Sequence, residues 1–126
     1  MGRNPGQDTD PKPFLQARGL RLVSGKGGVG LRGLDLEVRA GEILGVAGIA
    51  GNGQRELADL LSGAACADAG TVLIASRPMP TGDARAFRAA GVIPVAGDPL
   101  REVVVPGLTV AEHAALWQAA AGWRAL

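Results

Sequence analysis

The sequence predicts an α/β fold in which an antiparallel β layer precedes a strand, a glycine-rich loop and a helix. Residues 14–23 partly alternate apolar and polar side chains and residues 34–38 alternate strictly, as strands with one solvated face do. The continuous apolar run at residues 43–47 is typical of a parallel strand that is buried on both faces. Behind the loop, Glu56 suits an acidic first turn and Gly63 a helix end. Three leucines at helical spacing form the apolar face of this helix: Leu57, Leu60 and Leu61.

The elements after this helix have shorter patterns. Residues 71–75 and residues 92–93 predict strands, and Pro94 ends the second of them. Residues 84–90 predict a short helix. A capping box, in which a Glu follows a Thr by three positions, opens a last helix over residues 109–121.

Length and composition limit the function classes. The chain has 126 residues, 47% of them hydrophobic, and a formal net charge of +1, so we expect one globular domain at most and no nucleic-acid partner. Its one cysteine, Cys66, and one histidine, His113, exclude an internal disulfide and a Cys/His zinc site. The longest apolar stretch, residues 43–51, is far shorter than the roughly 20 residues that span a bilayer, so no direct membrane insertion is expected.

The polar start of the chain predicts a linker. Residues 1–13 are rich in turn formers and contain no apolar core that could serve as a secretory signal. We expect these residues to form a flexible linker, and residues 14–126 to carry the fold.

The loop before the helix has the frame of a phosphate-binding loop. In a Walker A loop, G-x-x-x-x-G-K-S/T, backbone N–H groups surround a phosphate, the Lys adds charge and the hydroxyl binds Mg²⁺. Here Gln54 replaces the Lys and Arg55 replaces the hydroxyl residue, and an Arg has only donors. We therefore expect weak or absent ATP binding, no bound Mg²⁺ and no catalytic residue. The candidate cofactor-binding residues are Gly48, Ile49, Ala50, Gly51, Asn52, Gly53, Gln54 and Arg55.

The order of these signals resembles the ATP-binding domain of ABC transporters, in particular the second half of the tandem ATP-binding subunits of bacterial sugar and nucleoside importers. That half of the family has a Walker A loop without lysine. Five separated segments carry the resemblance, at residues 38–43, 51–57, 70–73, 90–94 and 108–112.

The resemblance implies a fold, partners and a location. It implies the α/β P-loop NTPase core of an ABC domain, incomplete here, with an N-terminal antiparallel β layer and a parallel sheet beginning at Ile43. The partners would be transmembrane permease subunits and a second ATP-binding domain. The location would be cytoplasmic, at the inner face of the cell membrane.

The departures from the family pattern also matter. Val95 and Ala96 stand where the family has an acidic pair, and no aromatic residue lies between Ser24 and Leu34 to stack on adenine. The sequence contains no signature motif, Walker B carboxylates or switch histidine, so we expect residues 14–126 to be the first part of such a domain, unable to hydrolyse ATP alone.

Three other interpretations remain open. In the first, the chain is a non-enzymatic assembly module that docks on a partner through residues 94–108. In the second, it is a fragment without function. A dinucleotide-binding Rossmann fold is a minor alternative, because Ala47 stands where its first glycine should be and no acidic residue ends the next strand. A second glycine-rich segment, residues 26–30, resembles a deviant Walker A loop but lacks its second lysine, so we interpret it as a hairpin turn.

Overall fold

The computed structural model describes residues 12–23 and 29–120. The chain forms two compact units, Met1–Val92 and Ile93–Leu126, and each is described by itself. Most of the predicted linker and most of the predicted turn at residues 26–30 lie outside the described residues.

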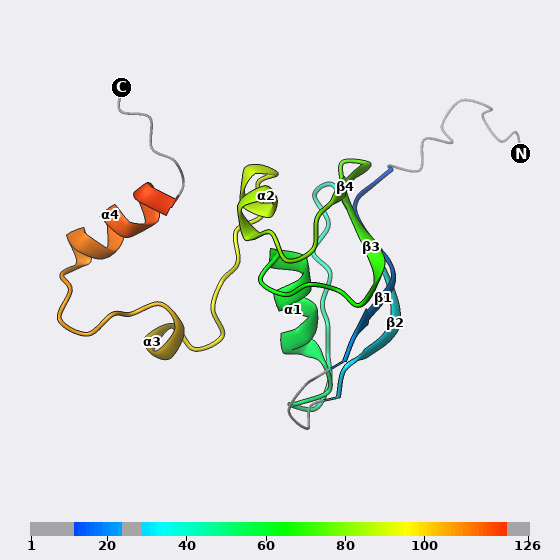
Figure 1. Ribbon diagram of the computed structural model, residues 1–126, viewed down its shortest axis with the longest axis horizontal. Coiled ribbons are helices and arrows are strands. Elements are labelled where there is room, and N and C mark those ends of the chain that lie inside the picture. Colours follow the sequence, from blue (N-terminus) through cyan, green and yellow to red (C-terminus); the bar gives the residue numbers. More distant parts are fainter. Residues whose placement is uncertain (1–11, 24–28, 121–126) are drawn as a thin grey trace, which may run out of the picture. The chain divides into compact units, whose positions relative to one another are not determined.

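The first unit is built on one antiparallel sheet (Figure 1). Its strands are β1 (Pro13–Leu22), β2 (Leu31–Arg39), β3 (Ala69–Ile74) and β4 (Arg77–Met79), in the order β2-β1-β3-β4. Every neighbouring pair is antiparallel. The predicted antiparallel layer is confirmed, and β4 is an addition to it. A strand of three residues with a proline at its centre carries too little pattern to be predicted.

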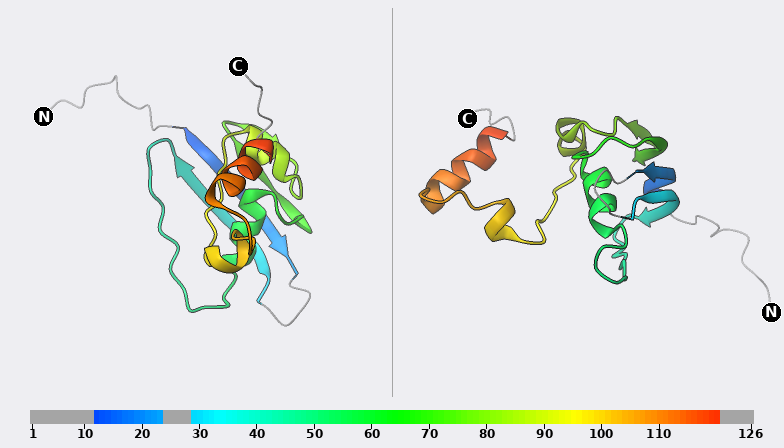
Figure 2. Two further views of the ribbon diagram at one scale, coloured as in Figure 1. Left: turned by 90° about the vertical axis from the view of Figure 1, so that its left-hand side faces the viewer. Right: turned by 60° about the horizontal axis from the view of Figure 1, so that its bottom comes forward.

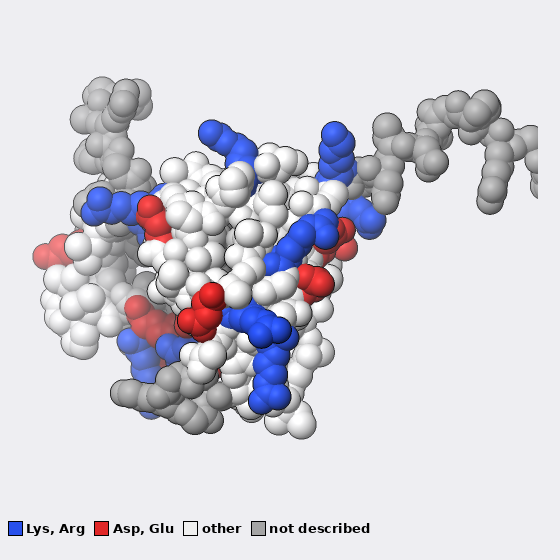
Figure 3. Space-filling model, turned by 45° about the vertical axis from the view of Figure 1, so that its right-hand side comes forward, with Lys and Arg blue, Asp and Glu red and all other residues white. Residues whose placement is uncertain are grey.

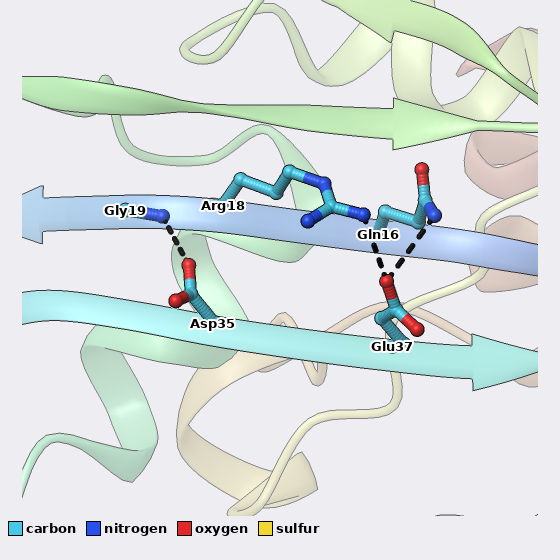
Figure 4. A network of polar contacts seen from close by, with 5 residues as sticks. All are labelled: Gln16, Arg18, Gly19, Asp35 and Glu37. Atoms are coloured by element: carbon cyan, nitrogen blue, oxygen red, sulfur yellow. Dashed lines mark hydrogen bonds and ion pairs between the residues drawn. The ribbon is translucent and has the colours of Figure 1, made fainter.

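Polar side chains join β1 to β2 on the solvated face (Figure 4). Glu37 Oε1 accepts hydrogen bonds from Arg18 Nη2 at 2.9 Å and from Gln16 Nε2 at 3.3 Å. The Gly19 N–H donates to Asp35 Oδ1 at 2.6 Å. These groups are solvent-exposed, so the ion pair stabilises the sheet only modestly.

The other face of the sheet packs on helices α1 (Gln54–Ser62) and α2 (Ala84–Ala89) (Figures 1 and 2). Both helices agree with the predicted ones, and Gly63 caps α1 as expected. The Asp83 carboxylate caps α2, since its Oδ1 accepts from the backbone N–H groups of Arg85 and Ala86. Among the residues that the structure describes, seven buried apolar residues form the core: Ala17, Leu20, Leu57, Leu60, Val72, Ile74 and Phe87.

The predicted strand at residues 43–47 is wrong for this structure. No strand forms there, all its residues are exposed, and the Ile43 side chain is 97% exposed. A strand buried on both faces needs strands beside it, and the sheet β2-β1-β3-β4 offers this segment no parallel partner. The predicted strand at residues 92–93 is absent for the same reason, so the described residues contain no parallel sheet.

The second unit contains α3 (Pro99–Glu102) and α4 (Val110–Ala120). The capping box at the start of α4 is confirmed. The Thr109 N–H and hydroxyl donate to Glu112 Oε2 at 2.7 and 2.8 Å, and the Glu112 N–H donates back to Thr109 Oγ1 at 3.3 Å. Helix α3 was not predicted, since four residues form only one turn.

The single histidine orders the chain between these two helices. His113 Nε2 accepts a hydrogen bond from the Val105 N–H at 2.9 Å, and His113 Nδ1 lies 2.9 Å from the Thr109 carbonyl oxygen. Because Nε2 accepts, the ring proton belongs on Nδ1, which donates to Thr109. This histidine therefore has a local structural role in the turn before α4.

The charges of the chain are of mixed sign. In the view of Figure 3, Lys and Arg side chains are interspersed with Asp and Glu side chains, with no large area of one sign. None of the helices in the part of the chain that the structure describes has the length and apolar character that a membrane-spanning helix needs.

Candidate functional site

The predicted site residues, 48–55, form a loop over residues 48–53 and the first two residues of α1, Gln54 and Arg55. The loop turns at Ile49 to Asn52, where the Asn52 N–H donates to the Ile49 carbonyl at 3.2 Å. The first hydrogen bond of α1 runs from the Leu57 N–H to the Gly53 carbonyl at 2.9 Å, so the N–H groups of the first turn come before the helical ladder. Gly53 takes the N-cap position with φ 97°, and no side chain caps this helix end.

The base of the loop rests on the start of β2. Gly53 is buried, and a Cβ placed there would lie 3.2 Å from Leu31 Cδ2 and 3.4 Å from the Val29 carbonyl oxygen. The sequence pattern identifies Gly53 as the last glycine of the loop, but it does not predict this contact with the start of β2. The β1–β2 hairpin thus holds the amino end of α1 in place.

The Gln54 side chain lies across the loop. Its Nε2 donates to the Ile49 carbonyl at 3.1 Å, and its Oε1 accepts from the Asn52 N–H at 3.1 Å. A Cβ at Gly48 would collide with Gln54 Nε2, so the flexible Gln54 side chain would have to shift to make room for it. The sequence predicts a neutral donor at Gln54, but it gives no sign that the carboxamide is engaged on both of its polar atoms.

The electrostatics of the loop are mild. The amino end of a helix carries partial positive charge and attracts anions, and Glu56 in the first turn offsets part of it. No lysine lies in the loop, and the Arg55 side chain is exposed. Among the described residues, no group of His, Cys, Asp and Glu side chains could hold a metal ion.

The first unit also has an open hollow that the sequence did not predict. It has a volume of about 390 Å³ and lies between α2 and the β3–β4 turn, and Arg77 is the one charged residue that lines it. The hollow is lined by none of the loop residues, and its walls are mostly apolar side chains such as Phe14, Ile74 and Met79. It offers shape and apolar surface, with no cluster of groups that could do chemistry.

The chain has clear relatives among known proteins. It is 43% identical to a ribose import ATP-binding protein of Rubrobacter xylanophilus over 113 residues, which are 89% of this chain and 22% of that protein. It is 37% identical to a nucleoside import ATP-binding protein of Lactococcus lactis over 81% of this chain and 20% of that protein. It is 35% identical to a glucose import ATP-binding protein of Haloferax volcanii over 83% of this chain and 19% of that protein.

The matched region is a small part of each relative. The chain spans about a fifth of the length of these proteins. No family model matches the chain. Homology to ABC ATPases implies a P-loop NTPase fold, of which the described residues form an antiparallel sheet and a few helices. Over most of its own length, the chain is homologous to ABC-type ATP-binding proteins of sugar and nucleoside importers, which confirms its resemblance to an ABC ATP-binding domain.

Proposed function

We propose that this chain contributes a degenerate ATP-binding half-site to an ABC importer for sugars or nucleosides. The observation that carries the proposal is a loop with the glycine frame of a phosphate site, placed at the amino end of α1, in a chain whose relatives are import ATP-binding proteins. The loop keeps its backbone donors and lacks the side chains that add charge and hold Mg²⁺.

The proposed contacts are made by the backbone. The N–H groups from Ile49 to Arg55 would receive the phosphate oxygens, because such donors at a helix start bind anions without any charged side chain. Gln54 would add a neutral donor and Arg55 nonspecific attraction. Mg²⁺ would have no protein ligand here, since neither Gln54 nor Arg55 supplies the hydroxyl or carboxylate oxygen that it prefers.

The proposed partners are permease subunits and a second ATP-binding domain. Hydrolysis would need groups from that second domain, because the described loop holds no carboxylate that could act on a water molecule. The chain would work at the inner face of the cell membrane, attached through the permease subunits.

One observation favours a second candidate, a non-enzymatic assembly module. Gln54 already satisfies one donor and one acceptor of the loop, so the loop keeps its shape without a ligand. In that case residues 94–108 would dock on a partner through apolar side chains that are exposed in the second unit, among them Val95 and Leu100. A fragment without function and a dinucleotide-binding fold are lesser alternatives.

Calorimetric titration with MgATP tests the nucleotide site. The double variant Gln54→Lys, Arg55→Ser restores a lysine and a hydroxyl, and each charge-assisted contact contributes about 1.5–3 kcal/mol. We expect the variant to bind MgATP at least about tenfold more tightly than the unmodified chain.

The double variant also controls for charge. It gains one positive charge at Gln54 and loses one at Arg55, so its net charge equals that of the unmodified chain. A gain in affinity therefore cannot come from general attraction. Equal affinities of the two proteins for MgATP would contradict the assignment of this loop as a phosphate site.

A further inference from the structure

The hollow beside α2 combines apolar walls with one charge. Its volume of about 390 Å³ lies within the range of small-molecule sites, roughly 300–1,000 Å³, which are mostly apolar with a few polar groups. Its walls come from the start of β1, from the β3–β4 hairpin and from α2. Phe14 lines it and is 48% exposed, so an aromatic ring is open to contact there.

Arg77 stands on the core-facing side of the sheet. The turn between β3 and β4 has two residues, Ala75 and Ser76, so Arg77 is the first residue of β4 and pairs with Ile74 across the hairpin. Paired residues of antiparallel strands direct their side chains to the same face, and Ile74 is buried in the core. The Arg77 side chain therefore leaves the sheet on its apolar face and borders the hollow.

The Arg77 guanidinium lacks a complement in the described part of the chain. Among the described residues, the structure gives it no hydrogen bond and no ion pair, whereas Arg18 on the solvated face pairs with Glu37 at 2.9 Å. A guanidinium has five N–H donors in a planar fork that matches a carboxylate. The charge complement of this hollow is thus an anionic group attached to an apolar body.

A small molecule suits the hollow better than a peptide. An extended peptide binds beside an edge strand by pairing with its backbone. The edge strand here is β4, which has three residues, and its central Pro78 has no N–H to donate. The affinity of an occupant must therefore come from apolar contact and one ion pair.

We propose that this hollow binds a small apolar monocarboxylate. The carboxylate pairs with Arg77, and the apolar body contacts Phe14, Ile74 and Met79. The hollow shares no residue with the loop at residues 48–55, so this site is separate from the proposed nucleotide site and its test is independent of it.

Titration of the full chain with octanoate, followed by its amide and methyl NMR signals, tests the site. We expect the signals that move to gather at residues 14, 74–80 and 86–90. Octanamide has the same chain without the charge, and we expect it to bind about threefold to tenfold more weakly, because an exposed ion pair contributes only modestly. The absence of shifts at millimolar octanoate, or shifts centred on residues 43–49, would overturn the proposal.

Two arginine variants test the charge. Arg77→Met keeps an apolar stem and removes the guanidinium, and we expect it to bind octanoate about threefold to tenfold more weakly than the unmodified chain. Arg32→Met is the matched control, because Arg32 is also exposed on the sheet but does not line the hollow. Equal octanoate affinities of the two variants would overturn the role of Arg77.

A third variant tests the place of binding. Ala89 lines the hollow from α2 and is exposed, so Ala89→Phe fills the hollow without entering the core. We expect this variant to lose octanoate binding, while circular dichroism shows the same helix content. Unchanged affinity in Ala89→Phe would overturn the proposal. Signals of the lining residues that move with protein concentration alone would identify a second copy of the chain as the occupant and would also overturn it.

Discussion

At the scale of single residues, a glycine joins the two helices of the first unit. Gly63 ends α1 with φ 77°, and its N–H donates to the Leu60 carbonyl at 3.2 Å. A Cβ there would lie 2.7 Å from a ring carbon of Phe87 and 2.8 Å from the Asp83 carbonyl oxygen. The end of α1 therefore packs directly on the start of α2, without space for a methyl group.

Replacing this glycine should be costly. We expect Gly63→Ala to lower the free energy of unfolding by about 1–3 kcal/mol, because the new methyl group meets backbone and a buried ring and the positive φ disfavours alanine. Gly45→Ala is the matched control, since Gly45 has no heavy atom within 4 Å of an added Cβ. Urea unfolding of both variants measures the difference, and equal midpoints would contradict the proposed close packing.

At the scale of elements, the sequence pattern was enough to predict a helix or strand whose stabilising contacts lie within the element or with a strand next to it. The leucine spacing gives α1, the alternation gives β1 and β2, and the capping box gives the start of α4. Each depends on contacts within the element or with the next strand. The apolar run at residues 43–47 depends on strands that would flank it, so its pattern predicts burial that the described structure does not supply.

In the loop at residues 48–53, the glycines could be predicted from the sequence. The hydrogen bonds of the Gln54 side chain could not, because a side chain that bonds to the backbone beside it leaves no periodic pattern.

The capping box of α4 should respond to acid. The N–H and the hydroxyl of Thr109 donate to the Glu112 carboxylate, and these bonds lower the pKa of Glu112 below its ordinary value, with a smaller contribution from nearby His113. Because the folded-state pKa is lowered, the stabilisation is present above the unfolded-state pKa and is lost as the pH falls through the lowered value. We expect the first turn of α4 to fray in that acidic range.

Amide exchange in the first turn of α4, measured against pH, tests this expectation. Glu112→Gln is the matched control, because its amide cannot lose a charge and should give no acid transition at this turn. A transition of the same size in both proteins would mean that another group controls the start of α4.

At the scale of the whole molecule, each unit exposes apolar side chains. Ile43 is 97% exposed and Ile49 79% in the first unit, and Val95 is 90% and Val110 87% exposed in the second. Contiguous exposed apolar residues favour association with a partner or with further copies of the chain. In the first unit, residues 43–49 form one exposed segment that contains four of these side chains, Ile43, Leu44, Val46 and Ile49.

We expect the isolated chain to self-associate, and a charge within this segment to reduce the effect. Light scattering should give a larger average mass for the unmodified chain than for Ile43→Lys at the same concentration. Ala58→Lys adds the same charge on the exposed side of α1 and should not change the association. A monodisperse monomer at high concentration would contradict this prediction.

The two edge strands of the sheet limit how copies of the chain can associate, because they disfavour the addition of a further strand. β2 lies at one border and carries charged residues at alternating positions, Asp35, Glu37 and Arg39 among them, while β4 at the other border has three residues and a central proline. Charged side chains, short length and proline are features by which natural edge strands avoid pairing, so β2 and β4 are poor templates for a further strand. Association should therefore leave the sheet at four strands and proceed through amorphous apolar contacts instead of cross-β fibres.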